Sequence, residues 1–492
     1  MTALNTKAHD ALIADSPKSF FQGLLNNKSR SLVFLAIVLF ALSTRLYRLD
    51  FPKDFYFDEI YHGFTAAAYL HNDKRAYDPW AKPPENRAFE WSHPPLSKLL
   101  MAGMMAVFGE DSFGWRVGSA VFGTLAIIAT GILAFELFGS LDLALTAMAL
   151  LSLENLFLTQ SRIAMNDSYL VLFVLLTFIC YLRWRKRPAS LKYLLLTGLC
   201  LGLALATKWT TLYLFIIIAI DLMAKVFFAL PIAVWLGETI RLNLWKALKR
   251  FDHHHELPNY PFKQHQQTFQ LGLIQAIFTE VRPLAFLALG LIPVLVYLAS
   301  YSQYFLMGYD WSQFVELQKQ MWWYHSGLKA THPYQSTPWQ WIFDLRPVYM
   351  HIDASKPNET AFIYNLGNAV VLYAGLIAVL SQLRRLLCEK SEQNEQIRFL
   401  LLAYFMLWVP WLISPRIMLF YHYLPAVPLL CIILARWLDK LRGSQKPMSW
   451  WIRGFILGAA ALWFIVFYPH NTGLFLKKDL MDSVYFALDS WR

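Results

Sequence analysis

The chain contains few charged residues for its length. Asp, Glu, Lys and Arg make up 16% of its 492 residues, while 57% are apolar, whereas soluble globular domains carry about 25% charged residues. This composition excludes an ordinary soluble protein and indicates a membrane protein with several spans.

Cysteine is scarce and repeats are absent. Three of the four cysteines, Cys180, Cys200 and Cys431, lie within apolar runs, and no CxxC pair occurs. We therefore expect neither a disulfide framework nor a zinc site. The sequence shows no repeat at 20 to 50 residues and no halves related by inversion, which argues against solenoids and against the inverted-repeat transporters.

Acidic residues are outnumbered by basic ones, 33 to 44. In a soluble chain this excess would indicate nucleic acid, but here the basic residues cluster in short runs between apolar segments. With a cytoplasmic N-terminus, these clusters all fall on the cytoplasmic side, as the positive-inside rule requires. We therefore expect membrane lipids, and no nucleic acid, as partners. The clusters lie at 183–187, 246–250, 384–385 and 436–442.

Long apolar runs dominate the remainder of the chain. A transmembrane helix needs roughly 17 to 25 mostly apolar residues, and the pattern predicts an all-α polytopic membrane protein with about eleven such helices. The predicted spans are 31–49, 113–138, 141–160, 167–184, 191–207, 210–230, 284–305, 362–383, 398–414, 417–436 and 453–469.

The same pattern predicts the organisation of the chain. Residues 1–30 form a cytoplasmic tail, 31–470 a transmembrane catalytic domain, and 471–492 an extracytoplasmic tail. Within the domain we expect a first outer loop at 50–112, a cytoplasmic loop at 231–283 and a second outer loop at 306–361. The first span follows a long polar lead, so we interpret it as a retained anchor and not as a cleaved signal.

Two adjacent carboxylates, Asp58 and Glu59, follow the first span among aromatic residues. Charges at the edge of a membrane are costly and commonly functional. Adjacent residues point in different directions on a helix or a strand, so the pair cannot readily act together as acid and base on one sugar ring. One of them is expected to act on a substrate while the other orients it or binds a cation; an acidic helix cap is the alternative.

Cations in the first outer loop and at the start of the second span are candidates for binding an anion. Pro94 and Pro95 stiffen the segment between His93 and Lys98, and Lys98 could meet a lipid phosphate or simply extend to the interface. The guanidinium of Arg116 also suits phosphate, with a salt bridge to Asp58 or Glu59 as the alternative.

Further candidates fall at the outer ends of later spans and in the second outer loop. Asp167 either reaches the Asp58 loop or caps its own helix. The aromatic and polar residues of the second loop line either a sugar or peptide site or the membrane interface. Basic and aromatic residues before the tenth predicted span suit a phosphate headgroup. The residues concerned are Lys208, Trp209, His332, Tyr334, Arg416, Tyr421 and His422.

Six of these motifs, in this order, resemble the protein O-mannosyltransferase family, in particular its bacterial, polyprenol-phosphate-mannose-dependent members of the GT-C membrane class. The resemblance runs from about residue 31 to 470. It is carried by Asp58-Glu59 with Gly63, His93-Pro94-Pro95-Leu96 with Lys98, Ser161-Arg162 with Asp167, Lys208-Trp209, His332-Pro333-Tyr334 and Tyr421-His422-Tyr423-Leu424-Pro425.

The resemblance implies a GT-C fold with two large extracytoplasmic loops, and transfer of mannose from a polyprenyl-phosphate carrier to Ser or Thr of exported proteins, met at the export channel. It implies that Asp58 is the base and that Arg162 joins the lipid-phosphate-binding cations. The MIR domain of eukaryotic members is absent, and Ile60-Tyr61-His62 departs from the usual family order.

Because a phosphate leaves readily, a single base with cations on the phosphate would suffice, and transfer would be inverting. The lipid-linked sugar is then a substrate, no cofactor is required, and a divalent cation is left open. A sibling enzyme that modifies lipid A or another glycolipid is the alternative in the same class. A transporter is the alternative from another class. We expect the enzyme in the bacterial cytoplasmic membrane.

Overall fold

The computed structural model describes residues 19–228, 283–327, 329–388, 393–443, 447–486 and 488–491. Among them, six helices are long and apolar enough to cross a membrane, and five shorter apolar helices accompany them. The chain is therefore a multi-pass membrane protein that is mostly helical, as predicted. The predicted cytoplasmic loop and its histidines lie almost wholly outside the described residues.

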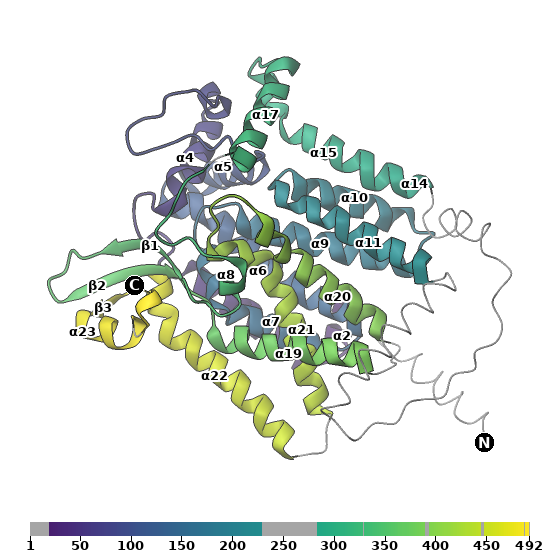
Figure 1. Cartoon of the computed structure of the whole chain (residues 1–492). Helices are drawn as coiled ribbons and strands as arrows, with labels where there is room; N and C mark the ends of the chain where they lie inside the picture. The colour runs from purple at the N-terminus through teal and green to yellow at the C-terminus, as the bar shows by residue number, and fades with distance from the viewer. Residues whose placement is uncertain are drawn as a thin grey trace, which may run out of the picture.

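The first half of the chain forms a layered helical bundle (Figure 1). Helices α6 and α9 pack against one another, and α7 and α10 flank them. Its elements are α2 (Phe20–Leu25), α3 (Lys28–Leu46), η1 (Phe57–Ile60), α4 (His62–Leu70), η2 (Lys74–Tyr77), α5 (Leu96–Phe108), α6 (Ser112–Phe138), α7 (Leu141–Ser152), α8 (Asn155–Gln160), α9 (Asp167–Lys186), α10 (Leu191–Leu205), η3 (Trp209–Thr211) and α11 (Leu212–Phe228).

The second half completes the bundle and adds the outer elements. Helix α21 packs on α7 and α19. The elements are α14 (Pro283–Phe286), η4 (Leu287–Leu291), α15 (Ile292–Ser300), α16 (Ser302–Leu306), α17 (Trp311–Gly327), α18 (Pro338–Trp341), β1 (Val348–Asp353), β2 (Glu359–Asn365), α19 (Ala369–Cys388), α20 (Asn394–Met406), η5 (Val409–Ile413), η6 (Phe420–Ala426), α21 (Val427–Arg442), α22 (Pro447–Thr472), β3 (Phe475–Lys477), α23 (Lys478–Leu480), η7 (Met481–Tyr485) and η8 (Asp489–Trp491).

A small antiparallel sheet, in the order β1-β2-β3, was not predicted. Strand β2 occupies residues that the apolar pattern assigned to the start of a span at 362, and α19 begins only at Ala369. A short run of β-branched and aromatic residues cannot be distinguished from helix by hydrophobicity alone. Pairing with β1 and with β3 near the C-terminus makes it a strand.

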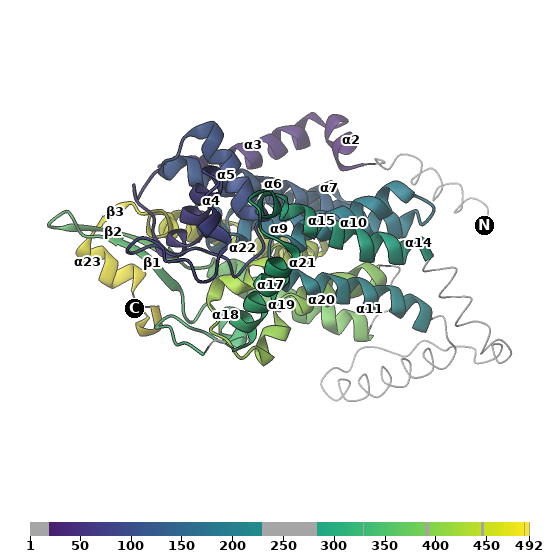
Figure 2. The same cartoon turned by 90° about the horizontal axis from the view of Figure 1, so that it is seen from above.

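The centre and the perimeter of the bundle differ in burial. Nearly all of α9 is buried by other helices, whereas α3 and α22 bury little of their surface. Figure 2 shows α3 along one edge of the bundle. An apolar helix with an uncovered surface matches a lipid-facing position, because lipid replaces protein as the apolar environment.

The two ends of the bundle differ in what they carry: loops and the sheet at one, ion pairs of basic residues at the other. The first outer loop, the sheet and the C-terminal segment gather at one end (Figure 1). Residues from the predicted basic clusters form ion pairs elsewhere, at the termini of the spans: Arg183 with Glu136, Arg185 with Asp221, and Arg442 with Asp142. The predicted cluster at 246–250 lies outside the described residues.

The first turn of α6, which carries Arg116, packs tightly against the backbone that precedes the helix. Asp111 caps the helix by accepting hydrogen bonds from the N–H groups of Phe113 and Gly114. A Cβ atom at Gly114 would lie 1.7 Å from the carbonyl oxygen of Gly109. Only glycine fits there, so this contact sets how α5 turns into α6.

Candidate functional site

The adjacent carboxylates Asp58 and Glu59 point to different partners. Phe57, directly before them, has a φ of 49°, a conformation that costs a non-glycine residue about 1–3 kcal/mol. The turn continues as η1, and the Asp58 Oδ2 accepts a hydrogen bond of 3.2 Å from the hydroxyl of Tyr421. The two carboxylates therefore belong to two different environments.

Glu59 is fully buried and its oxygens are occupied. They accept hydrogen bonds from Nε and Nη2 of Arg116, both at 2.8 Å, and from the backbone N–H groups of Ala164 and Tyr56. A carboxylate held by so many donors is fixed in place. Glu59 thus joins the first outer loop to the start of α6 and to the segment before α9.

Arg116 is also fully buried. Besides Glu59, it donates to the carbonyl oxygens of Leu49, Pro52 and Asp54. Of the two interpretations of this residue, the salt bridge to Glu59 is the one that the structure contains. Its donors are directed at the chain that leads into Asp58 and not at an open space.

Lys98 and His93 converge on a third buried carboxylate, Glu90. The Lys98 ammonium donates to Glu90 and, at 2.9 Å, to the carbonyl of His93, while His93 Nδ1 lies 2.8 Å from Glu90 Oε1. Although burial opposes it, the Lys98 ammonium together with His93 holds the pKa of Glu90 well below its usual range. Lys98 is therefore a buried ion-pair partner and does not extend to the interface.

Arg162 closes the C-terminal end of α3. Its Nη1 donates to the carbonyl oxygens of Thr44, Arg45 and Tyr47 at 2.7 to 3.0 Å. The last carbonyls of a helix have no partners within the helix, and a cation there also opposes the negative end of the helix dipole. Arg162 thereby fixes the point at which the chain leaves the first span toward Asp58.

Asp167 and Lys208 form a pair beside Asp58. Lys208 Nζ lies 3.1 Å from Asp167 Oδ1, while Oδ2 of Asp167 is buried without a hydrogen-bond partner. Asp167 is the first residue of α9, and Asn166 holds the cap position before it. The Lys208 ammonium also lies 5.9 Å from the centre of the Tyr421 ring.

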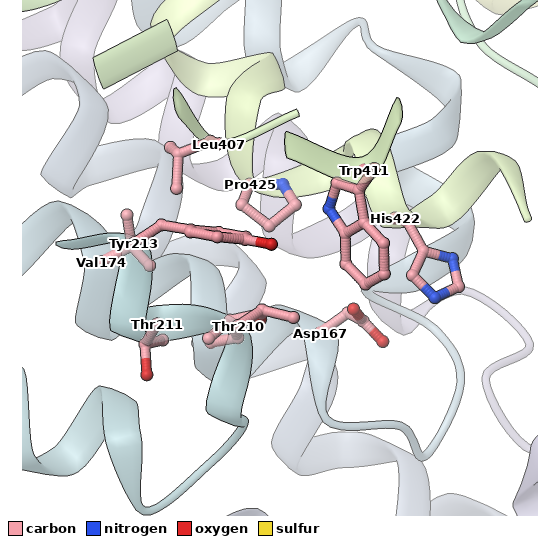
Figure 3. A pocket seen from close by; sticks show the side chains of 10 residues that line it. Asp167, Val174, Thr210, Thr211, Tyr213, Leu407, Trp411, His422 and Pro425 are labelled. Atoms are coloured by element: carbon pink, nitrogen blue, oxygen red, sulfur yellow. The ribbon is translucent and has the colours of Figure 1, made fainter. Parts of the chain in front are cut away.

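A small cavity of about 10 Å³ lies beside this pair, between α9, α11, η5 and η6. Asp167 and His422 lie at one end of it, whereas Val174, Leu407 and Tyr213 lie at the other (Figure 3). The remaining lining residues are Leu170, Thr210, Thr211, Trp411 and Pro425. The lining of the cavity is polar beside Asp167 and apolar among the spans, and the cavity has room for about one water molecule.

Arg416 differs from the other cations of this region. It is half-buried, donates to Nδ1 of His325, and lies 5.9 Å from the centre of the Tyr324 ring. Within the described ranges it forms no salt bridge with a carboxylate. Asp58 and Arg416 both act electrostatically on Tyr421 and on Tyr324, so the two opposite charges face the same space.

Burial raises the pKa of the Asp58 carboxyl to about 6, the hydrogen bond from Tyr421 lowers it, and the negative charge of Asp167 raises it further. Lys208 and Glu90 contribute smaller effects of opposite sign. A carboxylate with a pKa nearer to neutrality is a stronger base than an exposed one, yet it is still ionised at pH 7. These are the properties that a general base requires.

Other predicted residues line the surroundings of Asp58. His422 stacks on Tyr421 with 4.8 Å between ring centres. Trp209 donates its Nε1–H to the hydroxyl of Tyr297, and its ring lies near that of His325. His422 thus contacts Asp58's partner Tyr421, whereas Trp209 contacts Arg416's partner His325.

His332 and Tyr334 pack on the sheet instead. Tyr334 stacks on Tyr349 of β1, and Nδ1 of His332 accepts the backbone N–H of Tyr334. The second outer loop rejoins the site through Ser336, whose N–H donates to the carbonyl of Met418. Its contacts therefore link the sheet to the segment that carries Arg416.

Two residues of the site, Glu90 and His325, were not among the predicted site residues. Glu90 stands between Phe89 and Trp91, three residues before His93, and His325 follows four residues of which three are aromatic. The sequence features that linked Glu90 to predicted site residues were this closeness to His93 and its position eight residues before Lys98. Across the described part of the chain, no group of three His, Cys, Asp or Glu side chains has the geometry to hold a metal ion.

Comparison with solved structures defines the class of this fold. A chain of the S. cerevisiae protein O-mannosyltransferase complex bound to its sugar donor superimposes with a TM-score of 0.68 at 16% identity, over 94% of this chain and 93% of that one. The protein has the fold of a GT-C membrane glycosyltransferase.

Sequence models identify the family. The model described as dolichyl-phosphate-mannose-protein mannosyltransferase matches residues 35–251, and that of the C-terminal membrane region of protein O-mannosyltransferase matches residues 310–491. The chain belongs to the protein O-mannosyltransferase family.

Related bacterial proteins agree with this family assignment. A polyprenol-phosphate-mannose-protein mannosyltransferase of Mycolicibacterium smegmatis is 26% identical over 64% of this chain, and that of Corynebacterium glutamicum is 25% identical over 81%. The aligned region spans 63% of the length of the mycobacterial protein and 81% of the corynebacterial one.

Proposed function

We propose that the protein transfers mannose from a polyprenyl-phosphate-mannose donor to Ser or Thr hydroxyls of exported proteins. One observation carries this proposal: around Tyr421, Asp58 has no cation in direct contact, and Arg416 has no carboxylate partner among the described residues. An acyl or metal-centred reaction would not need this pair, whereas displacement of a phosphate by a hydroxyl needs one base and one cation.

The charges of the other candidates are neutralised within the protein. Arg116 pairs with Glu59, Lys98 with Glu90, and Lys208 with Asp167. A buried ion pair is held by its own geometry, and removing one partner leaves an uncompensated charge. Four cations were predicted for the lipid phosphate: Arg116, Lys98, Arg162 and Arg416. Because Arg162 is occupied by the carbonyl oxygens at the end of α3, Arg416 is the candidate that we retain.

In the proposed reaction, the Asp58 carboxylate takes the proton of the acceptor hydroxyl as its oxygen attacks the anomeric carbon of mannose. The bond from that carbon to the phosphate oxygen breaks on the opposite face, so the configuration inverts. The departing polyprenyl phosphate carries the negative charge, which Arg416 stabilises. Tyr421 holds Asp58 by its hydroxyl.

The apolar helices that surround the Asp58 end of the bundle support a lipid-linked donor. The cavity beside Asp167 is lined by apolar side chains of these helices, but at about 10 Å³ it is too small in this structure to hold an isoprenoid chain. The related proteins of Mycolicibacterium smegmatis and Corynebacterium glutamicum are polyprenol-phosphate-mannose-protein mannosyltransferases, which supports this donor and a protein acceptor here. A glycolipid acceptor is the competing possibility within the same fold.

We also propose that the Asp58 end of the bundle is extracytoplasmic and that the membrane is the bacterial cytoplasmic membrane. The support is the charge distribution, with Arg183, Arg185 and Arg442 paired at termini of the spans away from the Asp58 loop. Acceptors would then be met as they leave the export channel.

The function can be tested with purified enzyme and a panel of polyprenyl-phosphate sugars, offered together with a Ser/Thr peptide and with lipid A. Mass spectrometry should find one hexose on the peptide only with the mannose donor, attached in the configuration opposite to that of the donor. Transfer to lipid A alone, or retention of configuration, would contradict the proposal.

The rate should depend on pH through Asp58. Because its pKa is raised to about 6, the base is ionised above that value and protonated below it. We expect kcat/KM to be level above about pH 7 and to fall tenfold per pH unit below the pKa. The measurement is initial rate against pH at low donor concentration; a profile that is level down to pH 5 would exclude Asp58 as the base.

Replacing Arg416 by Ala should weaken donor binding and transfer together. A charge-assisted hydrogen bond to phosphate contributes roughly 1.5–3 kcal/mol, so kcat/KM for the donor should fall about 10- to 200-fold. The KM of the acceptor peptide should change little. Arg75→Ala, which removes an exposed arginine paired with Asp73 in the first outer loop, is the matched control and should retain full activity.

A further inference from the structure

His325 of α17 lies where three separate parts of the chain meet. Its Nε2 lies 2.7 Å from the carbonyl oxygen of Ser92 in the first outer loop, and its Nδ1 contacts Nη1 of Arg416. Its ring also packs edge-on against that of His93, with 5.0 Å between centres. The neighbouring Tyr324 meets the same parts of the chain through its ring, which packs edge-on against Trp91 and lies 5.9 Å from Arg416, but only His325 does so by hydrogen bonds in the described ranges.

These two contacts determine the state of the imidazole. A carbonyl oxygen only accepts, so Nε2 must carry the proton that is donated to Ser92. A guanidinium only donates, so Nδ1 must be the unprotonated acceptor for Arg416. Burial and the nearby charge of Arg416 lower the pKa of His325 to about 4, and the neutral tautomer is therefore the form present at neutral pH.

We infer that His325 is a positioning residue that directs the guanidinium of Arg416 toward the donor phosphate; this inference rests on the proposed function. Among the residues that the structure describes, no carboxylate holds Arg416; a carboxylate there would neutralise the charge that the phosphate requires. A neutral acceptor solves this problem, since it fixes the orientation of Arg416 and leaves its full positive charge available.

The geometry also explains why this acceptor is a histidine on α17. The Ser92 carbonyl orients the ring through Nε2, and Ser92 itself is tied to Glu90 by its hydroxyl at 2.5 Å. Glu90 is the carboxylate that holds Lys98 and His93. The buried Glu90 cluster therefore serves as the support for His325, which in turn supports Arg416.

A double-mutant cycle tests the inference, with donor KM and kcat measured for His325→Ala, Arg416→Ala and the pair. His325→Ala should raise the donor KM about tenfold, leave the acceptor KM unchanged, and change kcat less than threefold. In the Arg416→Ala background the same substitution should have an effect below twofold, because its effect passes through Arg416. His71→Ala, a histidine paired with exposed Glu110, is the control and should match the parent enzyme.

A conservative variant supplies a second measurement if His325→Ala lowers the yield of folded protein. In His325→Asn the side-chain oxygen can occupy the place of Nδ1, and we expect it to recover at least half of the lost donor affinity. Additive effects of His325→Ala and Arg416→Ala, or no recovery by Asn, would overturn the inference about His325. An unchanged donor KM in Arg416→Ala would instead contradict the proposed function itself.

Discussion

Replacing Asp58 by Asn should reduce transfer by roughly 10²–10⁴-fold while leaving a folded protein in the membrane. Asn keeps the size of the side chain and an oxygen that can accept the hydroxyl of Tyr421, but it cannot take a proton from the acceptor hydroxyl. The measurement is kcat with saturating donor and peptide. Activity near that of the parent enzyme would exclude Asp58 as the base.

The same substitution has an expected effect on stability that separates chemistry from folding. The folded-state pKa of Asp58 is raised from 3.8 to about 6, so the folded protein binds the proton more tightly than the unfolded chain. The contribution of this group to stability is thus present below about pH 4 and lost as the pH rises through about 6. Asp58→Asn should therefore melt at or above the parent temperature at pH 7. Asp54→Asn, which alters an exposed carboxylate four residues earlier, should retain both activity and stability.

Disrupting the pair of Glu59 and Arg116 should have its main effect on folding. Removing one partner of a buried ion pair costs about 3–5 kcal/mol, and Arg116→Met also leaves the carbonyls of Leu49, Pro52 and Asp54 without their donor. We expect Arg116→Met and Glu59→Gln to lower the melting temperature in detergent strongly. Their combination should be less destabilising than the sum of the two.

The control for this pair is Glu110→Gln, which removes an exposed carboxylate paired with His71 in the same loop. Its melting temperature should match that of the parent. The transfer activity of the Glu59 and Arg116 variants should follow the amount of folded protein that remains. If Glu59→Gln instead kept its melting temperature and lost transfer, Glu59 would take part in the chemistry.

The roles of Asp58 and Glu59 show how much of a site the order of residues can predict. Adjacency alone indicates that the two cannot share one task, because neighbouring side chains diverge. It does not indicate which one faces the substrate. That depends on Arg116, Ala164 and Tyr421, which lie 57, 105 and 363 positions away from their carboxylate partners.

The cations illustrate the same limit. From their positions at the outer ends of spans, Lys98, Arg116, Arg162 and Arg416 are equivalent candidates for a phosphate. Glu90 and the carbonyls at the end of α3 distinguish them, because a cation already satisfied by a buried partner is not free to bind a ligand. Pairings over such separations in the chain leave no periodic signal.

The sequence by itself determined the class of this protein. A scarcity of charge and long apolar runs require a membrane solvent, because no soluble fold can bury so many apolar residues, and six ordered motifs were enough to indicate the family. Tertiary structure alone decided the three-stranded sheet, the division of labour between Asp58 and Glu59, and the pairing of Arg416 with His325. Hydrophobic pattern is a local property of the chain, whereas hydrogen bonds and ion pairs depend on which distant segments the fold brings within 3 Å of each other.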